Sequence, residues 1–416
     1  MTDTPMPRDY DAVIIGGGPA GTTLATLVQR SGQRCLVLER AKFPRYHIGE
    51  SLIPHTYGVL DKLGVLPRLE ASDFPVKHSV RFVSPSGDES TPFYFSETID
   101  GARSRTWQVE RSEFDLICLD NARASGVDVC TSIGADALLF DGDRAVGVRT
   151  RANGGEARDV RARVVVDASG HSTVIGSQLG LRQPVPGLDK ASIWGYYRGG
   201  TRLPGIDAGE TTIFVLDSQR SWAWYIPLPN DIVSVGVVAA PDRLYGTGEQ
   251  VEDVFEQIMR HCSPLSERLA PATRVGKFRG SRRLAYRNRQ TCGDGWVMVG
   301  DARAFLDPVY SSGLYLALSS ADLAAESVAE ALTKGDVGAE NLGRFEPRLA
   351  AGVEVIRRLI HAFYDPGFSF GSFVKRFPDH RRTLIDCLVG DVIDKDMTGF
   401  TEALEQMTPP PPRLDA

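Results

Sequence analysis

Residues 11–39 read DAVIIGGGPAGTTLATLVQRSGQRCLVLE, and this stretch decides the fold. The apolar run at 12–15 is too short for a helix and meets three glycines. A helix-competent segment then leads to a second β-type run at 35–38, which ends in Glu39. This order predicts a strand, a tight turn, a helix and a parallel strand.

The glycines have the spacing Gly16-x-Gly18-x-x-Gly21, and each has a mechanical use. Gly16 allows the tight turn, Gly18 lets backbone amides approach a pyrophosphate, and Gly21 lets the helix lie close to the strand. Glu39 ends the second strand, where its carboxylate can accept hydrogen bonds from a ribose hydroxyl. The stretch predicts a dinucleotide site without saying which dinucleotide binds.

The composition of the 416 residues is that of a globular chain, with 42% apolar and 24% charged residues. A net charge of −6 and the absence of a dominant basic stripe argue against nucleic acid as a partner. The sequence shows neither a signal-length apolar run at its start nor an apolar stretch of 18 residues, so we expect a cytoplasmic protein that makes no use of a membrane. Six cysteines without CxxC spacing are expected to be reduced, mostly buried and free of metal: Cys35, Cys118, Cys130, Cys262, Cys292 and Cys387.

Parallel-sheet signals return twice after the first, at 162–170 and at 295–301. Between them, residues 192–240 alternate with period two and are rich in aromatics, which predicts antiparallel strands. We therefore expect a discontinuous first domain (1–75, 104–176 and 281–338) and a sheet-based substrate domain (76–103 and 177–280). Residues 339–416 are expected to be mostly helical, with a Pro-rich tail. The polar loop at 40–54 either contacts the cofactor or is solvated surface.

The fingerprint, Arg111, the turn at 167–170 and the Gly300-Asp301 pair resemble the glutathione-reductase-type FAD fold of the aromatic hydroxylases. The resemblance implies an α/β FAD domain in which Asp301 binds the ribityl chain. The helix after Pro308 would point its N-terminus at the flavin ring, where it stabilises the negative charge of the reduced form. The fingerprint and the resemblance together give the cofactor contacts Gly16, Gly18, Ala20, Gly21, Glu39, Arg40, Ile48, Gly49, Glu50, Ser51, Arg111, Asp301, Pro308, Gly313 and Leu314.

Three further motifs are similar to those of the flavin-dependent halogenases. Residues 222–227 read WAWYIP and match that family's WxWxIP, Lys77 in FPVK matches its catalytic lysine, and DPVYSSG at 307–313 resembles its halide loop. Each motif alone has an ordinary alternative: Trp222 and Trp224 as core, Lys77 as surface, and the serines before Gly313 as a helix cap. Because all three occur together in family order, we interpret the chain as a halogenase.

The resemblance also implies a mechanism. Reduced FAD, supplied by a separate flavin reductase, would react with oxygen to give a flavin hydroperoxide. Chloride or bromide, held by the backbone amides of Ser312 and Gly313, would attack it and form hypohalous acid. Lys77 would hold the electrophile beside the substrate, while Trp222 and Trp224 would separate the substrate from the flavin. The usual arginine after the Ser169-Gly170 turn is missing, so we expect no stable nicotinamide site.

Tyr310 stands where tryptophan-specific halogenases carry an acid, so we expect a phenolic or pyrrolic substrate in natural-product (antibiotic) biosynthesis, with Tyr310, Phe363 and Phe368 as pocket candidates. The substrate would be free or tethered to an acyl or peptidyl carrier protein. Residues 344–382 carry a net charge of +4 and would be either a docking face for an acidic carrier or a solvated surface. The competing functions are a flavin monooxygenase or prenyl reductase of the same fold, and a flavoprotein that only binds.

Overall fold

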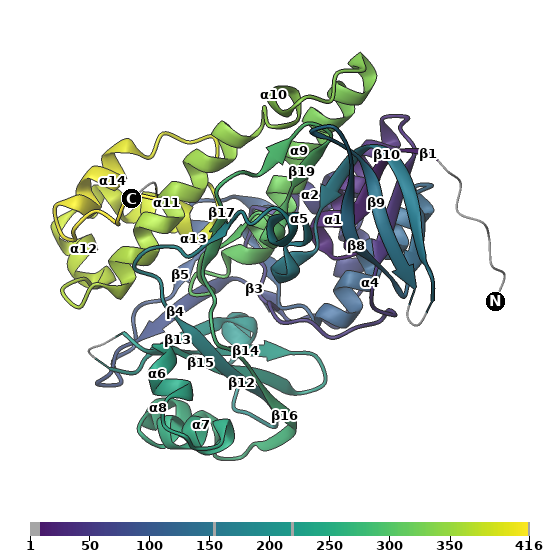
Figure 1. The fold of residues 1–416 in the computed structure, drawn as a ribbon. Coiled ribbons are helices and arrows are strands. Elements are labelled where there is room, and N and C mark those ends of the chain that lie inside the picture. Colours follow the sequence, from purple (N-terminus) through teal and green to yellow (C-terminus); the bar gives the residue numbers. More distant parts are fainter. Residues whose placement is uncertain (1–8, 153–154, 218–219, 415–416) are drawn as a thin grey trace.

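A computed structural model describes residues 9–152, 155–217 and 220–414 (Figure 1). The predicted dinucleotide stretch forms β1 (Asp9–Ile15), α1 (Pro19–Arg30) and β2 (Cys35–Glu39). β1 and β2 pair in parallel, with Ala12 opposite Cys35 and Ile15 opposite Leu38. The prediction of a strand, a turn, a helix and a parallel strand is confirmed.

The main sheet joins strands from distant parts of the chain. Its order is β18 (Cys292–Gly293), β19 (Trp296–Met298), β10 (Ala157–Asp167), β1, β2 and β7 (Asp128–Thr131), with β8 (Ile133–Asp141) and β9 (Arg144–Ala152) added as antiparallel strands beside β10. The strands from β19 to β7 are parallel to one another. Both returns of the parallel pattern, at 162–170 and at 295–301, therefore enter one sheet.

Both faces of the main sheet are covered, as a parallel sheet requires. Ala12 and Ile14 face α1 and the long helix α9 (Ser312–Lys334), while Val13 and Ile15 face the side of β8, β9 and α5 (Val174–Gln178). The period of two along β1 puts alternate residues into these two cores. The remaining helices of this part are α2 (Thr56–Leu63), α3 (Leu66–Glu70) and α4 (Arg111–Ala124).

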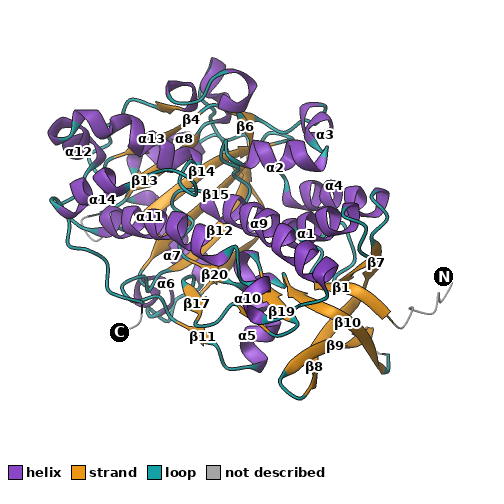
Figure 2. Cartoon of the chain, turned by 90° about the horizontal axis from the view of Figure 1, so that it is seen from above, coloured by secondary structure: helices purple, strands orange, loops and turns teal. Residues whose placement is uncertain are grey.

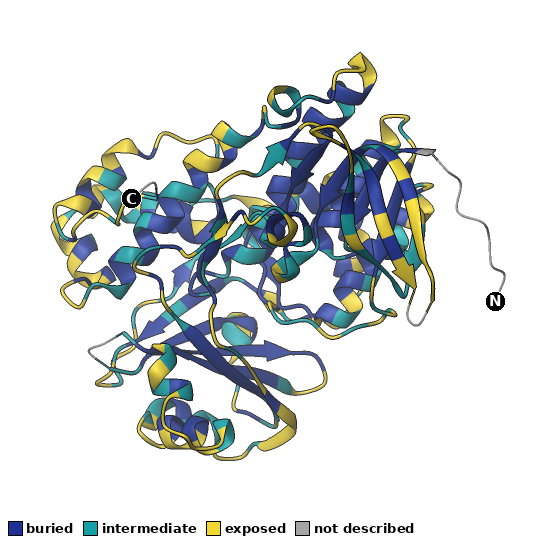
Figure 3. Ribbon diagram, in the orientation of Figure 1, coloured by how far each residue is buried: buried dark blue, intermediate teal, exposed yellow. Residues whose placement is uncertain are grey.

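A second, mostly antiparallel sheet lies beside the first (Figure 1). Its order is β16 (Thr273–Ser281), β12 (Ala191–Arg198), β15 (Ile232–Ala239), β14 (Trp222–Leu228), β13 (Thr211–Val215), β4 (Ser79–Val83) and β5 (Phe93–Tyr94). The antiparallel strands expected between 192 and 240 are confirmed, and one pair, β13 with β4, is parallel. Figure 3 shows that the inner strands of this sheet are buried.

The two faces of the second sheet have different partners. Ala223 and Tyr225 of β14 face the helices α6 (Pro241–Tyr245), α7 (Val251–Arg260) and α8 (Ser263–Leu269). Trp222 and Trp224 face the opposite way, into the core shared with the C-terminal helices. The alternation of β14 thus turns both tryptophans away from α6–α8 and toward the middle of the molecule.

The C-terminal segment is helical, as predicted, and lies against the second sheet (Figure 2). Its helices are α10 (Ala339–Leu342), α11 (Glu346–Tyr364), α12 (Phe370–Arg376), α13 (Arg381–Val389) and α14 (Thr398–Glu405). Breaks at the proline-containing stretches 365–367 and 377–378 separate α11, α12 and α13. The exact domain boundaries expected from the sequence stay a prediction.

Two small sheets complete the fold: β3 (Val76–Lys77) with β6 (Thr106–Trp107), and β11 (Arg182–Gln183), β17 (Tyr286–Asn288) and β20 (Ala304–Phe305). All six cysteines are free; Cys35, Cys118 and Cys387 are buried and the other three are half-buried. Among the described residues, no group of His, Cys, Asp or Glu is arranged to hold a metal ion. No helix formed by these residues is long and apolar enough to cross a membrane.

Candidate active site

A cavity of about 700 Å³ is lined by residues of both the main and the second sheet. It extends from the glycine turn, along the loop at 45–51 and the turn at 168–172, to the tryptophans of β14. Among the residues predicted from the sequence, those that line it are Gly16, Gly18, Ala20, Glu39, Arg40, Ile48, Gly49, Glu50, Ser51, Arg111, Trp222, Trp224, Asp301, Pro308, Gly313 and Leu314.

The three fingerprint glycines have different structural roles. Gly16 has φ +109°, and a Cβ there would lie 2.3 Å from the carbonyl oxygen of Ala168. A Cβ on Gly21 would lie 2.0 Å from the carbonyl oxygen of Gly16, so this glycine packs the helix on the turn and does not line the cavity. Within the described part of the chain, a Cβ on Gly18 would meet only the end of a side chain, Arg45 Nη2 at 3.3 Å, and Gly18 faces the cavity.

Glu39 and Arg111 are both held by the protein itself. The Glu39 carboxylate accepts hydrogen bonds from the amides of Gly17 at 2.9 Å and Ala41 at 2.7 Å. Arg111 donates to Asp115, at 2.8 and 3.1 Å, and to the carbonyl oxygen of Ile48 at 2.6 Å. The guanidinium of Arg111 therefore fixes the loop that carries Ile48 and Gly49 against the cavity.

The other end of the cavity lies at the N-terminus of α9. Ser311 precedes the helix with φ +56°, and Gly313 faces the cavity while Ser312 is buried outside its lining. The positive end of a 23-residue helix thus points into the site. Burial raises the pKa of Asp301 at the same end, while His171 and Arg111 oppose the rise.

Lys77 is 2% exposed, which is rare for a lysine. Its Nζ donates to Ser51 Oγ at 2.8 Å and to the carbonyl oxygen of Leu52 at 3.2 Å, and it lies 5.5 Å from the centroid of the Phe95 ring. Burial lowers the pKa of the amine to about 7, and the charge of Glu210 opposes the shift. Lys77 does not itself line the cavity, but Ser51 does, and the Ser51 hydroxyl lies 3.1 Å from that of Thr211, also in the lining.

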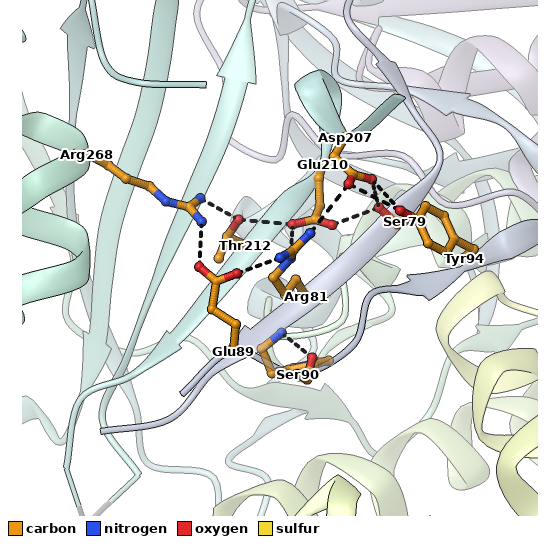
Figure 4. A network of polar contacts seen from close by, with 10 residues as sticks. Ser79, Arg81, Glu89, Ser90, Tyr94, Asp207, Glu210, Thr212 and Arg268 are labelled. Carbon is orange, nitrogen blue, oxygen red and sulfur yellow. Dashed lines mark hydrogen bonds and ion pairs between the residues drawn. The ribbon is translucent and has the colours of Figure 1, made fainter. Parts of the chain in front are cut away.

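Glu210 belongs to a polar network on the second sheet (Figure 4). Its carboxylate accepts hydrogen bonds from Ser79 Oγ at 2.9 Å and from Arg81 Nε at 2.9 Å. Arg81 also pairs with Glu89 and Asp207, and Tyr94 donates to Asp207 at 3.0 Å. Because Arg81 already neutralises Glu210, the charge of this carboxylate offsets only part of the lowering of the Lys77 pKa by burial.

Trp222 and Trp224 form one wall of the cavity. Their ring centroids are 6.0 Å apart, and Trp194 of β12 lies 6.4 Å from Trp224. Gly236 lies opposite Trp224 across the β14–β15 pair, and a Cβ on this glycine would come within 2.2 Å of the indole. The wall therefore depends on a glycine on the neighbouring strand, which the sequence motif does not include.

Glu50 is a buried carboxylate in the lining of the same cavity. It accepts a hydrogen bond from Tyr196 Oη at 2.6 Å, and Tyr196 in turn lies 3.0 Å from the hydroxyl of Tyr46. Burial raises the pKa of Glu50 to about 7, Glu110 adds to the rise, and hydrogen bonds from Tyr196 and Ser234 together with the charge of Arg111 oppose it.

Three predicted pocket residues lie outside the cavity lining. Tyr310, Phe363 and Phe368 belong to the buried aromatic cluster between the second sheet and α11. Phe363 meets the Trp222 ring edge-on at 6.4 Å, and Tyr310 meets Phe363 at 6.1 Å. The structure therefore places them behind the tryptophan wall.

The basic segment at 344–382 is largely neutralised by ion pairs. Arg344 pairs with Glu330, Arg348 with Asp394, Arg357 with Glu354, Arg358 with Glu354 and Glu405, and Arg381 with Glu97. Four of these acids, Glu330, Asp394, Glu405 and Glu97, lie outside the segment, so its charge of +4 overstates the local field. Lys375, Arg376 and Arg382 are exposed.

The chemical groups in the lining of the cavity match those needed to bind FAD. The cavity has two helix N-termini for negative charge and a carboxylate at the end of β2 for a ribose, and no backbone of another described segment lies within 4 Å of where a Cβ on Gly18 or Gly313 would be. Sequence reasoning missed Trp194 and Thr211 in the lining and Tyr364 behind it. Of these, the period-two alternation of β12 could have revealed Trp194; the others depend on contacts between distant segments.

Comparison with known proteins agrees with this fit. The family described as "FAD binding domain" matches residues 9–354. A 1H-pyrrole-2-carbonyl-[peptidyl-carrier protein] chlorinase of Pseudomonas fluorescens is 31% identical over 92% of this chain and 90% of its own length. The corresponding brominase of Pseudoalteromonas luteoviolacea is 31% identical, with 96% and 97% covered. The structure of the flavin-dependent brominase Bmp2 superposes with a TM-score of 0.85 at 31% identity, over 96% of this chain and 98% of that one.

These relatives confirm the predicted fold class and the predicted FAD cofactor. They also favour halogenation over the alternatives of a monooxygenase, a prenyl reductase and a protein that only binds. The cavity, the lysine and the tryptophan wall lie in a chain that matches halogenases over nearly its full length. This chain belongs to the flavin-dependent halogenases, within the FAD-binding-domain family.

Proposed function

We propose that this enzyme halogenates an electron-rich pyrrole or phenol, using chloride or bromide, with Lys77 as the catalytic residue. The observation that carries the proposal is the setting of Lys77. Its amine is buried, is hydrogen-bonded to two neutral oxygens, and has a pKa near 7. A large fraction of the amine is therefore neutral at physiological pH, and its lone pair can take up or orient an electrophile.

The reduced flavin, when bound, supplies the activated oxygen that oxidises the halide. The amides of Ser312 and Gly313, at the N-terminus of α9, would hold the halide at that end of the cavity, where the helix favours an anion. Oxidation of the halide to hypohalous acid would use one oxygen atom of O2, while the two electrons of the reduced flavin reduce the other oxygen atom to water. Reaction of the hypohalous acid with the arene then replaces a ring hydrogen with the halogen and releases a second water.

The wall formed by Trp222 and Trp224 would keep the arene away from the flavin. Both indoles are bulky and nearly fully buried, and they separate the cavity from the aromatic cluster that contains Phe363. Phe363, Phe368 and Tyr310 remain our candidates for the substrate side. The ring would lie among them and beside Lys77, with the hydroxyls of Ser51 and Thr211 between the lysine and the cavity.

A carrier-bound pyrrole is the substrate that the relatives favour, since two of them act on a pyrrole-2-carbonyl group attached to a peptidyl carrier protein. Tyr310 stands where tryptophan-specific halogenases carry an acid. A pyrrole or phenol activates its own ring more easily than an indole does, so the loss of that acid fits such a substrate. For an acidic carrier, the docking face would be reduced to Lys375, Arg376 and Arg382 at the ends of α12 and α13. We further propose that a separate flavin reductase supplies the reduced FAD.

The test supplies FAD, NADH, bromide and an unrelated flavin reductase, and offers free phenols, free pyrroles and a carrier-bound pyrrole. Mass spectrometry should show the bromine isotope doublet on a phenol or pyrrole product, and omission of the reductase should abolish it. A product that carries oxygen and no halogen would refute halogenation and favour a monooxygenase.

Charge reversal tests the docking face. Lys375→Glu, Arg376→Glu and Arg382→Glu together should raise KM for the carrier-bound substrate about tenfold or more and leave a free pyrrole unaffected. The matched control reverses Arg144, Arg158 and Arg161, three exposed residues of the β9–β10 region. An equal effect of both triple variants would rule out a specific docking face.

A further inference from the structure

One carboxylate links the turn before α9 to the tryptophan wall. Asp307 is buried, and its Oδ1 accepts a hydrogen bond from the amide of Val309 at 3.0 Å. Its Oδ2 accepts from the hydroxyl of Tyr364 at 2.8 Å. Tyr364 Oη in turn accepts from Trp222 Nε1 at 2.8 Å.

The chemistry of these groups permits one direction for this chain of hydrogen bonds. An indole N–H only donates and an ionised carboxylate only accepts, so the Tyr364 hydroxyl must accept from Trp222 and donate to Asp307. The carboxylate makes the second bond charge-assisted and therefore stronger than a bond between neutral groups. The position of the Trp222 indole is thus specified through the hydroxyl of Tyr364.

Two hydrogen bonds and one nearby lysine keep the pKa of the buried Asp307 carboxylate below neutral pH. Burial raises its pKa to about 6, while hydrogen bonds from Tyr364 and Val309 and the charge of Lys190 oppose the rise. Lys190 Nζ lies 4.1 Å from the centroid of the Tyr364 ring.

The end of α11 holds Trp222 on two sides. Tyr364 binds the indole N–H, and its neighbour Phe363 meets the ring of Trp222 at 6.4 Å with an interplanar angle of 89°. The helix ends here because Pro366 follows Asp365, its C-cap residue. Three separate segments, β14, the loop at 306–311 and the end of α11, therefore meet at one hydroxyl.

We infer that Tyr364 and Asp307 are positioning residues: they hold the Trp222 indole as the wall between the flavin cavity and the aromatic cluster, and they tie that wall to the turn that presents Ser312 and Gly313. The inference rests on the proposed function, because it gives the wall its role. The link makes the wall and the halide turn one mechanical unit, so that loosening one loosens the other.

The test uses Tyr364→Phe, which keeps the ring and removes only the hydroxyl. Its matched control is Tyr225→Phe, on the same strand as Trp222 but on the opposite face, which loses one hydrogen bond to the carbonyl oxygen of Thr201 at 2.9 Å. In the protein without flavin, hydrogen exchange of the Trp222 indole N–H is followed by NMR. The signal of this N–H is identified as the one that is missing in Trp222→Phe. We expect exchange to be about fivefold faster or more in Tyr364→Phe and unchanged in the control.

With flavin and substrate added, Tyr364→Phe should lower the ratio of halogenated product to hydrogen peroxide severalfold, with the Kd for FAD within twofold of wild type. Asp307→Asn retains an acceptor oxygen, so its ratio of halogenated product to hydrogen peroxide should lie between those of wild type and Tyr364→Phe. Unchanged indole exchange in Tyr364→Phe, or an equal loss of product ratio in Tyr225→Phe, would overturn the inference. If wild type formed no halogenated product, the proposed function would fail, while the exchange rates would still decide whether Tyr364 positions Trp222.

Discussion

Replacing Lys77 with methionine should stabilise the protein while it abolishes halogenation. Methionine has a similar length and carries no charge, so it removes the cost of burying an amine whose pKa falls from its usual 10.5 to about 7. At about 1.4 kcal/mol for each pKa unit, the difference between these two pKa values means that burying Lys77 costs roughly 5 kcal/mol of folding free energy at pH 7. The carbonyl oxygen of Leu52 and the hydroxyl of Ser51 lose a donor, which costs about 1–2 kcal/mol.

The sign of the pH dependence follows from the two pKa values of Lys77. Between pH 7 and 10.5 the unfolded chain binds a proton at Lys77 that the folded chain does not, so wild-type stability rises with pH in this window. The stabilisation by Lys77→Met should therefore be about 3 kcal/mol at pH 7. By pH 10 it should have decreased by about 4 kcal/mol, because the ionisation cost has nearly vanished.

Urea unfolding at pH 7, 8, 9 and 10, followed by tryptophan fluorescence, measures this difference. The control is Lys62→Met, an exposed lysine that pairs with Asp322 at 2.6 Å, where we expect a change within about 0.5 kcal/mol at every pH. If the free energies of unfolding of Lys77→Met and wild type differ by the same amount from pH 7 to 10, the pKa of Lys77 is not lowered. The reason for a neutral amine would then be refuted.

Three further predictions follow from single contacts. Gly21→Ala should prevent stable folding, because its Cβ would collide with the backbone of Gly16, whereas Gly18→Ala should fold and bind FAD more weakly; circular dichroism and flavin fluorescence separate the two effects. Gly236→Ala should displace the Trp224 indole and destabilise the protein by about 1–3 kcal/mol, which near-UV circular dichroism and urea unfolding would detect. Tyr196→Phe should raise the pKa of Glu50 from about 7 to a higher value, because the ionised carboxylate loses a donor; infrared spectroscopy of the carboxyl band checks this, and an unchanged or lowered midpoint would contradict it.

Much of the fold could be predicted because it follows from local patterns. The glycine spacing at 16–21 fixes a turn that only glycine permits at Gly16 and Gly21, and the alternation of 222–228 puts Trp222 and Trp224 on one face. Both features depend on residues that are close in sequence. Most of the residues predicted as cofactor contacts line the cavity for the same reason, since they lie on the two loops that leave the parallel strands and on the N-terminus of α9.

The rest depends on contacts that sequence spacing does not encode. Lys77 lies in a short stretch typical of a surface, and contacts with Phe95 and with the loop at 51–52 help to bury it. The arginines of 344–382 look like a basic patch until acids such as Glu97 and Asp394 are brought to them by the fold. Asp307 and Tyr364, 57 residues apart, meet only because α11 lies across the second sheet.

The central claim is that Lys77 carries the halogenation step, and product analysis of Lys77→Ala tests it most directly. Wild type and variant, at equal FAD occupancy, are supplied with reduced flavin, bromide and a pyrrole, and the brominated product is quantified by mass spectrometry. Flavin oxidation should continue in the variant, while brominated product should fall by a factor of about 100 or more. Brominated product that persists undiminished in Lys77→Ala would contradict the account.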